Sequence, residues 1–252
     1  ILDSPNFINS RAVLIKQFKD KKQILMNSFY IRERKRLNIL LDDDGQPLGG
    51  SWSYDSENRE PLPKNFVGLN KPKTISSLEI DRAINWVNKN FFGNYGSTDY
   101  FIWPINHEQA EKQFDIFLKH KLANFGKYQD AVWQDDPFLF HSYLSSSINI
   151  GLLDPKKIIN KLCSSSVLEN NSLASIEGLI RQIIGWREFM FGIYATYDKF
   201  AKIKGQKRQL PKSFWQGTTG IEPLDVSIKQ LLETGYLHHI YRLMFFGNFM
   251  FI

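Results

Sequence analysis

Apolar side chains recur every three or four residues through most of the chain after residue 76, the spacing of an amphipathic helix. Ser76 or Ser77 can cap the first of these helices. The pattern predicts five helices. Their aligned positions are Ile80, Ile84, Val87 and Phe91; Ala110, Phe114, Phe117, Leu118 and Leu122, after a start near His107; Leu139, Leu144 and Ile148, after Pro137; Ile176, Ile180 and Ile183 with Arg187 on the same stripe, from about Leu173; and Ile228, Leu231 and Leu232, after a start at Asp225 or Ser227. No alternating strand pattern of useful length and no internal repeat appears after residue 76. The sequence therefore predicts an all-α fold.

The first 75 residues differ from the rest of the chain in composition. Residues 32–36 form a dense basic stretch, which we interpret as a solvated helix face in preference to a nucleic-acid contact. Residues 42–45 predict a surface turn, and residues 45–75 are rich in Gly, Pro, Asn and Ser but keep aromatic side chains. We therefore predict a connector with a basic helix and an ordered loop over residues 1–75, and a helical domain over residues 76–252.

Composition narrows the class of protein. The 252 residues carry 32 Lys and Arg against 26 Asp and Glu, a net charge of +6, and 42% hydrophobic with 14% aromatic residues exclude a wholly disordered chain. Cys163 is the single cysteine, which excludes an internal disulfide framework and a cysteine-ligated zinc or iron–sulfur site built from this chain alone. We expect a reducing compartment, the cytoplasm.

The two ends suggest a fragment. The chain begins with Ile1 and shows no signal segment. Residues 243–252 form an apolar run that is too short for a bilayer, which needs about 20 residues. We interpret the run as a core helix that continues in a longer protein, and we predict no membrane association.

Three segments carry polar residues where an apolar helix would not favour them. In residues 141–147, hydroxyls at a helix start form either an anion site or plain N-capping. In residues 181–189, Trp, Arg and Gln indicate either a buried network or ligand wall, or an Arg187–Glu pair with Trp186 as core filler. These alternatives stay open from the residues alone.

The third segment is residues 235–242. His238 and Arg242 share one helix face, whereas His239 is turned about 100° away. A zinc site would need further ligands at matching spacing, and none stands out, so we predict no metal site. The alternatives are a proton donor beside an anion-binding arginine, or two satisfied core histidines.

Five motifs in order resemble the flavin domain of DNA photolyases and cryptochromes, over nearly the whole chain. The motifs lie at residues 49–59, 126–133, 141–145, 177–188 and 235–242. The first of them and the general spacing are most similar to the bacterial branch, which comprises (6-4) photolyases and related cryptochromes. The resemblance implies the end of a connector followed by the first part of a helical domain that binds FAD.

The resemblance also assigns roles. It implies that His239, with His238 beside it, is catalytic, since His239 matches the histidine of (6-4) photolyases, and that Trp215 passes electrons to the flavin. The residues that it assigns to FAD binding are Tyr128, His141, Ser142, Leu144, Ser145, Gln182, Trp186, Arg187, Tyr236 and Arg242. Pro223 stands where many members of this branch carry their first cluster cysteine, so we expect no iron–sulfur cluster. An antenna chromophore would belong to a missing N-terminal domain.

The implied function is light-dependent repair of UV-damaged DNA through reduced FAD, with (6-4) pyrimidine photoproducts as the favoured lesion. We expect a monomer that binds damaged DNA, and a fragment that is inactive by itself. Two alternatives stay open: a cryptochrome-type blue-light photoreceptor without repair, and a helical nucleic-acid-binding protein without flavin.

Overall fold

The computed structural model describes residues 4–69, 71–197 and 209–251. These residues form helices and connecting turns with no β-strand, apart from an isolated bridge between Leu41 and Pro47. The all-α prediction is confirmed. The chain divides into two compact units, each described by itself below. Unit 1 draws on Ile1–Glu60, Ile105–Gln129 and Ser142–Gly205, and unit 2 draws on Pro61–Pro104, Asp130–His141 and Gln206–Ile252. The predicted connector contributes to both units, and its boundary with the helical domain stays a prediction.

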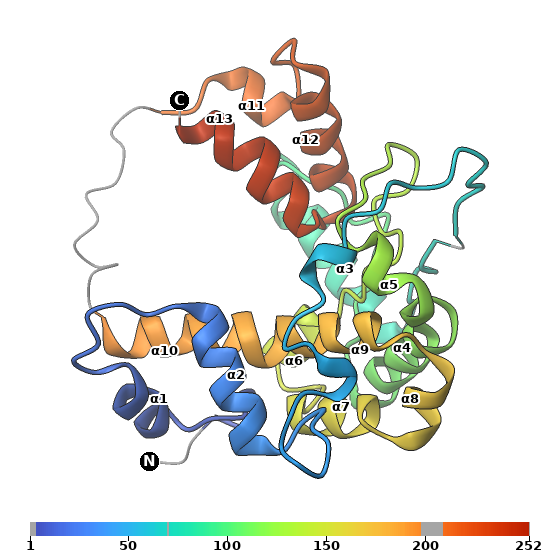
Figure 1. Ribbon diagram of the computed structural model, residues 1–252. Helices are drawn as coiled ribbons and strands as arrows, with labels where there is room; N and C mark the ends of the chain where they lie inside the picture. Colours follow the sequence, from blue (N-terminus) through green and yellow to red (C-terminus); the bar gives the residue numbers. More distant parts are fainter. Residues whose placement is uncertain (1–3, 70, 198–208, 252) are drawn as a thin grey trace. The chain divides into compact units, whose positions relative to one another are not determined.

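Unit 1 is built around one long helical run that starts at Leu173 and ends at Thr196 (Figure 1). The run is interrupted in its middle by a π-helical turn. The run consists of α9 (Leu173–Ile180), the π-helical η3 (Arg181–Arg187) and α10 (Glu188–Thr196). The other elements of unit 1 are α1 (Arg11–Phe18), α2 (Met26–Leu37), the 3₁₀ turns η1 (Leu48–Gly50) and η2 (Asp55–Glu57), α4 (His107–His120), α5 (Leu122–Tyr128), α6 (Ser145–Asn149), α7 (Pro155–Leu162) and α8 (Ser165–Asn170).

The core of unit 1 lies where α9 and η3 meet α5, α4 and α2. Ile176, Ile180 and Ile183 are buried there, as their spacing predicted, and they pack with Phe114 and Phe117 of α4. A smaller cluster of Leu14, Phe18, Phe29 and Phe189 joins α1, α2 and α10. The predicted helix starts near His107 and Leu173 are both confirmed, with Asn106 and Ser172 as side-chain caps.

The basic stretch of α2 is only partly a solvated face. Arg34 is 1% exposed and donates hydrogen bonds to the carbonyl oxygens of Ile39, Leu40 and Trp52. Glu33 is fully buried and pairs with Arg36 at 2.7 Å. The interpretation of residues 32–36 as a surface run is therefore wrong for these positions, because two of the charges satisfy buried polar groups instead of water.

The helix predicted to follow Pro137 begins later, at Ser145. The Asp136 carboxylate accepts hydrogen bonds from the backbone N–H groups of Phe138 and Leu139, and Leu139 and Tyr143 have positive φ angles of 35° and 39°. An Asp side chain that binds the backbone two and three residues on favours a turn over a helix. Residues 137–144 are therefore a loop, and only α6 is helical.

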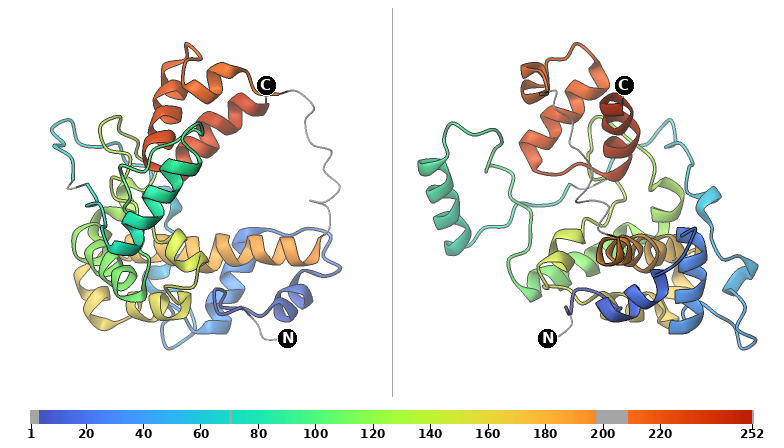
Figure 2. Two further views of the ribbon diagram at one scale, coloured as in Figure 1. Left: turned by 180° about the vertical axis from the view of Figure 1, so that it is seen from behind. Right: turned by 90° about the vertical axis from the view of Figure 1, so that its left-hand side faces the viewer.

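Unit 2 contains the remaining helices, with the C-terminal ones drawn in orange and red in Figure 2. They are α3 (Leu78–Asn90), α11 (Lys212–Gln216), α12 (Glu222–Thr234), the π-helical η5 (Tyr241–Phe246) and α13 (Gly247–Phe251). Ser77 caps α3 as predicted, whereas α12 begins before the predicted Asp225 because Pro223 fits its first turn. Leu231, expected to face inward, is 40% exposed.

Apolar positions on two helices of unit 2 face solvent rather than a core. In α3 only Ile80 is buried, and Val87 and Phe91 are exposed. In the C-terminal run Leu243 and Met244 are 65% and 53% exposed within this chain. The core helix of a longer protein stays a prediction, and residue 252 lies outside the described residues. Across the described part of the chain, no helix combines the length and the apolar character that a membrane span requires.

Candidate functional site

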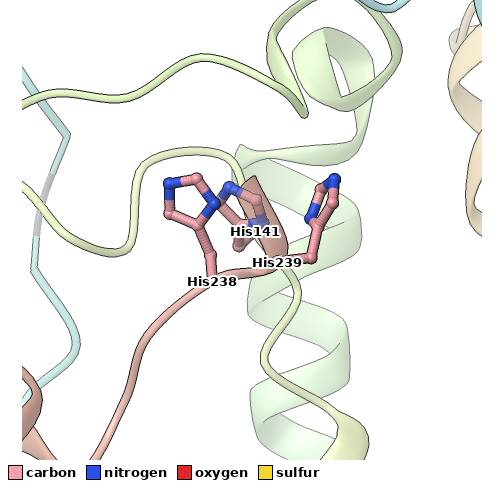
Figure 3. A group of neighbouring side chains, drawn as sticks. All are labelled: His141, His238 and His239. Carbon is pink, nitrogen blue, oxygen red and sulfur yellow. The ribbon is translucent and has the colours of Figure 1, made fainter. Parts of the chain in front are cut away.

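Three histidines from two distant segments of unit 2 gather in one place (Figure 3). His238 and His239 precede η5, and His141 lies within the loop at residues 137–144. The rings of His141 and His238 are stacked with centroids 4.3 Å apart, and the His239 ring lies 5.9 Å from both. The fold therefore unites two motifs that the sequence could only place separately.

His239 is the most accessible member of this histidine cluster. Its side chain is 42% exposed, and its Nε2 lies 3.1 Å from Oδ1 of Asp130. A carboxylate at that distance fixes the orientation of the ring. The arrangement presents an oriented imidazole that still reaches solvent or a bound molecule.

His238 is held in the neutral state. Its pKa is lowered to about 3, mainly by burial and also by the neighbouring His239 and Arg242, while Asp130 opposes them. The backbone N–H of Ile240 donates to its Nδ1 at 3.3 Å, so Nδ1 is the bare nitrogen of the neutral ring. His238 is therefore a neutral imidazole across the physiological range.

Aromatic side chains surround the segment before the cluster. The Tyr236 ring is stacked on Phe138 at 5.2 Å and tilted against Trp103 at 6.1 Å. Trp215, which is 50% exposed, is stacked on Tyr95 at 5.7 Å. Arg242 is exposed at the start of η5. Unit 2 thus holds six of the sequence-predicted residues, namely His141, Trp215, Tyr236, His238, His239 and Arg242.

The other predicted residues belong to unit 1, and one group of them lies around α6. Leu144 is buried at the start of this helix and gives it no side-chain cap, Ser142 is half-buried, and Ser145 is exposed. The hydroxyls of Ser146 and Ser147 are buried with no hydrogen-bond partner among the described residues. Both serines belong to the segment at residues 141–147 that the sequence indicates as either an anion site or an N-cap, but the resemblance assigns only Ser142 and Ser145 to FAD.

A second group lies on η3, where Trp186 is exposed and Gln182 is half-buried. Arg187 donates to the carbonyl oxygen of Asn6 and to Oδ1 of Asn149, with its guanidinium 4.1 Å from the centre of the Phe7 ring. The Arg187–Glu pair left open from the sequence is thus not how Arg187 is held. Tyr128 is half-buried at the last position of α5.

A buried ion-pair network joins α9 and the start of η3 to the segment at residues 49–59. Glu177 is fully buried and accepts hydrogen bonds from the Tyr30 hydroxyl, the Tyr54 backbone N–H and Arg181 Nε at 2.9, 3.0 and 3.1 Å. Arg181 also pairs with Asp55 at 2.7 Å. The two motifs at residues 49–59 and 177–188 are therefore joined through their charged residues, which favours the network alternative for this segment.

Comparison with known proteins gives matches over nearly the whole chain. Residues 1–103 match the family described as deoxyribodipyrimidine photo-lyase-related protein. The chain is similar to a (6-4) photolyase of Agrobacterium fabrum, 36% identical over 247 residues, which cover 96% of this chain and 48% of that protein. The chain thus spans about half the length of that relative.

Two further relatives share parts of the chain. An uncharacterized protein of Acanthamoeba polyphaga mimivirus, R853, is 36% identical over 111 residues, 43% of this chain and 85% of its own length. A deoxyribodipyrimidine photo-lyase of Buchnera aphidicola is 21% identical over 204 residues, 73% of this chain and 38% of its own length. With the helical fold and the ordered motifs, these matches identify the chain as a member of the photolyase-related family.

Proposed function

We propose that this chain serves light-dependent, FAD-mediated repair of UV-damaged DNA, with (6-4) photoproducts as the lesion. The observation that carries the proposal is the arrangement of His239, an accessible imidazole oriented by Asp130 beside two further histidines. The relative of Agrobacterium fabrum is named for the same lesion and covers nearly the whole chain. Asp130 was part of a recognised motif but was not selected as a site residue.

The residues of each unit fit what the resemblance assigns to FAD. In unit 1, the uncapped first turn of α6 and the two buried serine hydroxyls suit a phosphate, which accepts hydrogen bonds from such groups. Trp186, Met190 and Tyr194 form an exposed apolar stripe, 43%, 47% and 72% exposed, of the kind that a flat aromatic ring covers. In unit 2, Tyr236 and Arg242 are accessible, as contacts to a flavin require.

FAD, when bound, supplies light-driven one-electron chemistry. The protein's own task is to position the lesion and deliver a proton. His239 would donate that proton to the lesion, with Asp130 holding the ring in place. Trp215, half exposed and stacked on Tyr95, is suited to carry electrons through the protein.

The substrate must reach this site outside the double helix. A damaged dinucleotide flips out at a smaller cost than an intact one, because its pairing is already broken. The net charge of +6 favours contact with phosphates, and such contacts weaken as salt rises. DNA affinity should therefore fall steeply between low and physiological salt, for damaged and undamaged strands alike.

The decisive experiment compares His239→Ala with His120→Ala in the protein at its full natural length. His120 is an exposed histidine on α4, so its loss controls for imidazole removal alone. We expect the His239 variant to keep FAD and damaged-DNA binding and to lose repair of (6-4) oligonucleotides by about 10²-fold or more, as for other general acids. Normal repair by His239→Ala would overturn the assigned role.

Two other results would redirect the proposal. A parent protein that binds FAD but repairs no UV-damaged oligonucleotide in light would be a cryptochrome-type photoreceptor. An Arg242→Ala variant that loses only DNA affinity, in a protein that never takes up FAD, would indicate a nucleic-acid-binding protein. Loss of flavin in that variant supports the photolyase proposal instead.

A further inference from the structure

The ring nitrogens of His141, His238 and His239 form a set of potential metal ligands. One nitrogen from each ring lies within 4.8 Å of the others, and two of the three residues are buried. The sequence showed only the adjacent pair, and the fold adds the third histidine from a distant loop. The two other histidines of the chain, His107 and His120, lie exposed on α4 in unit 1 and are not part of this cluster.

The hydrogen bonds around the cluster leave a bare nitrogen on two of the rings. Nε2 of His239 is engaged by Asp130, so its Nδ1 is the free ligand atom. Nδ1 of His238 is the unprotonated nitrogen of the neutral ring, and it accepts the Ile240 N–H at 3.3 Å, so a metal ion on Nδ1 replaces that long hydrogen bond. Neutral imidazole is the form that binds metal.

Asp130 completes a recognisable arrangement around His239. Histidines that bind metal usually donate their second ring N–H to a carboxylate, which orients the ring and raises its basicity. Here the 3.1 Å contact between His239 Nε2 and Asp130 Oδ1 supplies such a partner. His239 is also 42% exposed, which gives an ion a route to the cluster.

From this geometry we propose that His141, His238 and His239 bind a divalent transition-metal ion, for which Zn²⁺ is the best-fitting occupant. Three imidazole ligands with a position left open to water suit Zn²⁺, and they suit Mg²⁺ or Ca²⁺ poorly, since those ions prefer oxygen ligands. The inference concerns metal binding and stands apart from the repair function proposed above.

Binding requires a small rearrangement. The planes of His141 and His238 are 23° apart, so the lone pairs of these stacked rings run side by side instead of converging. Zn–N bonds are about 2.0–2.1 Å, so nitrogens up to 4.8 Å apart must also draw together. Rotation of one ring about its side-chain torsions accomplishes both, and it breaks the stacking that the metal-free cluster shows.

A metal ion on His239 has one functional consequence, which rests on the proposed repair function. An imidazole whose Nδ1 binds a metal keeps only its Nε2 proton, which is directed at Asp130 and not at a lesion. The metal-bound and proton-donating states of His239 therefore exclude each other. Added Zn²⁺ should slow repair and a chelator should restore it, whereas metal affinity itself is measured without any repair assay.

The test is a titration of chelator-treated protein with Co²⁺, whose visible absorption reports coordination, followed by displacement with Zn²⁺. We expect one equivalent of tightly bound metal in wild type and at least a tenfold weaker affinity in each of His141→Ala, His238→Ala and His239→Ala. His107→Ala and His120→Ala are the matched controls and should bind as wild type does. Asp130→Asn should weaken binding by about 10- to 100-fold.

Two outcomes would overturn the inference: no stoichiometric metal in wild type, or a loss of affinity in the His107 and His120 variants that equals the loss in the cluster variants. His239→Ala keeps the test valid if the buried positions do not tolerate substitution, because its half-exposed side chain leaves the core intact. Circular dichroism of each variant checks that the helices are retained. Failure of the repair proposal would leave these binding results unchanged.

Discussion

Single buried carboxylates hold unit 1 together through donors that come from distant parts of the chain. The Glu177 carboxylate accepts hydrogen bonds from Tyr30, Tyr54 and Arg181. The Glu188 carboxylate accepts hydrogen bonds from the backbone N–H groups of Ile8 and Asn9, at 3.0 Å each. A buried charge is tolerable only when its hydrogen bonds are made. Each donor to these carboxylates is therefore a sensitive position, although most of them carry no chemistry.

Tyr30→Phe tests the sensitivity of one such donor by removing a single oxygen atom. The change removes only a hydroxyl that donates to Glu177 at 2.9 Å from a fully buried ring. The free energy of unfolding should fall by about 1–3 kcal/mol, because the Glu177 carboxylate loses a partner that no water replaces. Urea denaturation measures it. Tyr194→Phe, at a ring that is 72% exposed, is the control and should change stability by less than about 0.5 kcal/mol.

His238 makes the stability of the protein depend on pH. Its pKa is about 3 when folded and about 6.5 when unfolded, so the unfolded state binds the extra proton between these values. Stability is therefore complete above about pH 6.5 and is lost as pH falls toward 3, by about 2 kcal/mol at pH 5.

Denaturation of metal-free protein at pH 8 and pH 5 measures this effect. The difference in unfolding free energy between the two pH values should be smaller by that amount in His238→Asn than in wild type. His120→Asn, an exposed control, should keep the wild-type difference. Equal pH dependence in wild type and His238→Asn would show that His238 is not held neutral.

At the scale of elements, close contact between α5 and α9 shapes the centre of unit 1. Gly126 lies where a Cβ atom would meet the backbone nitrogen of Ser175 at 2.8 Å, and its own N–H donates to the Ser175 hydroxyl at 2.9 Å. Gly178 on α9 is different, because a Cβ there would make ordinary contacts of 3.5 Å or more. The same substitution should have opposite effects at these two glycines.

Gly126→Ala should lower the unfolding free energy by about 1–3 kcal/mol, since the neighbouring helix backbone must move to admit the methyl group. Gly178→Ala should be neutral or stabilising by up to about 1 kcal/mol, because alanine costs less conformational entropy than glycine in a helix. Thermal or urea unfolding of the two variants measures the change in unfolding free energy. Equal destabilisation of both variants would contradict the close helix contact.

At the scale of the whole molecule, the two units differ in how much apolar surface they bury. Both hydrophobic clusters of the described residues lie in unit 1. In unit 2, α3 buries only Ile80 and α11 buries no residue. Regions with few buried contacts open locally at a small free-energy cost. Unit 2 should therefore be the part of the chain that opens first.

Native-state hydrogen exchange tests this difference. Amides of α3 and α11 should exchange well before those of α5 and α9, which lie in the core of unit 1. Bound FAD or DNA should slow exchange in whichever segments they contact. Amides of α3 that exchange as slowly as those of α9 would contradict the expectation.

Helical periodicity was enough to predict the all-α class, the caps at Ser77 and the starts near His107 and Leu173. It failed at residues 137–144, where the Asp136 side chain competes for the backbone, and at Arg34, whose burial depends on carbonyl groups elsewhere in the fold. Local spacing reports which face of a helix is apolar. It does not report which charges find buried partners.

The sequence by itself determined the helical class, the family resemblance and most of the candidate residues, because these follow from local spacing and motif order. Only the tertiary structure decided that His141 joins His238 and His239, that Asp130 orients His239, and that His238 stays neutral. Those properties arise from burial and from distances between residues far apart in sequence. A pairing of that kind leaves no periodic trace along the chain.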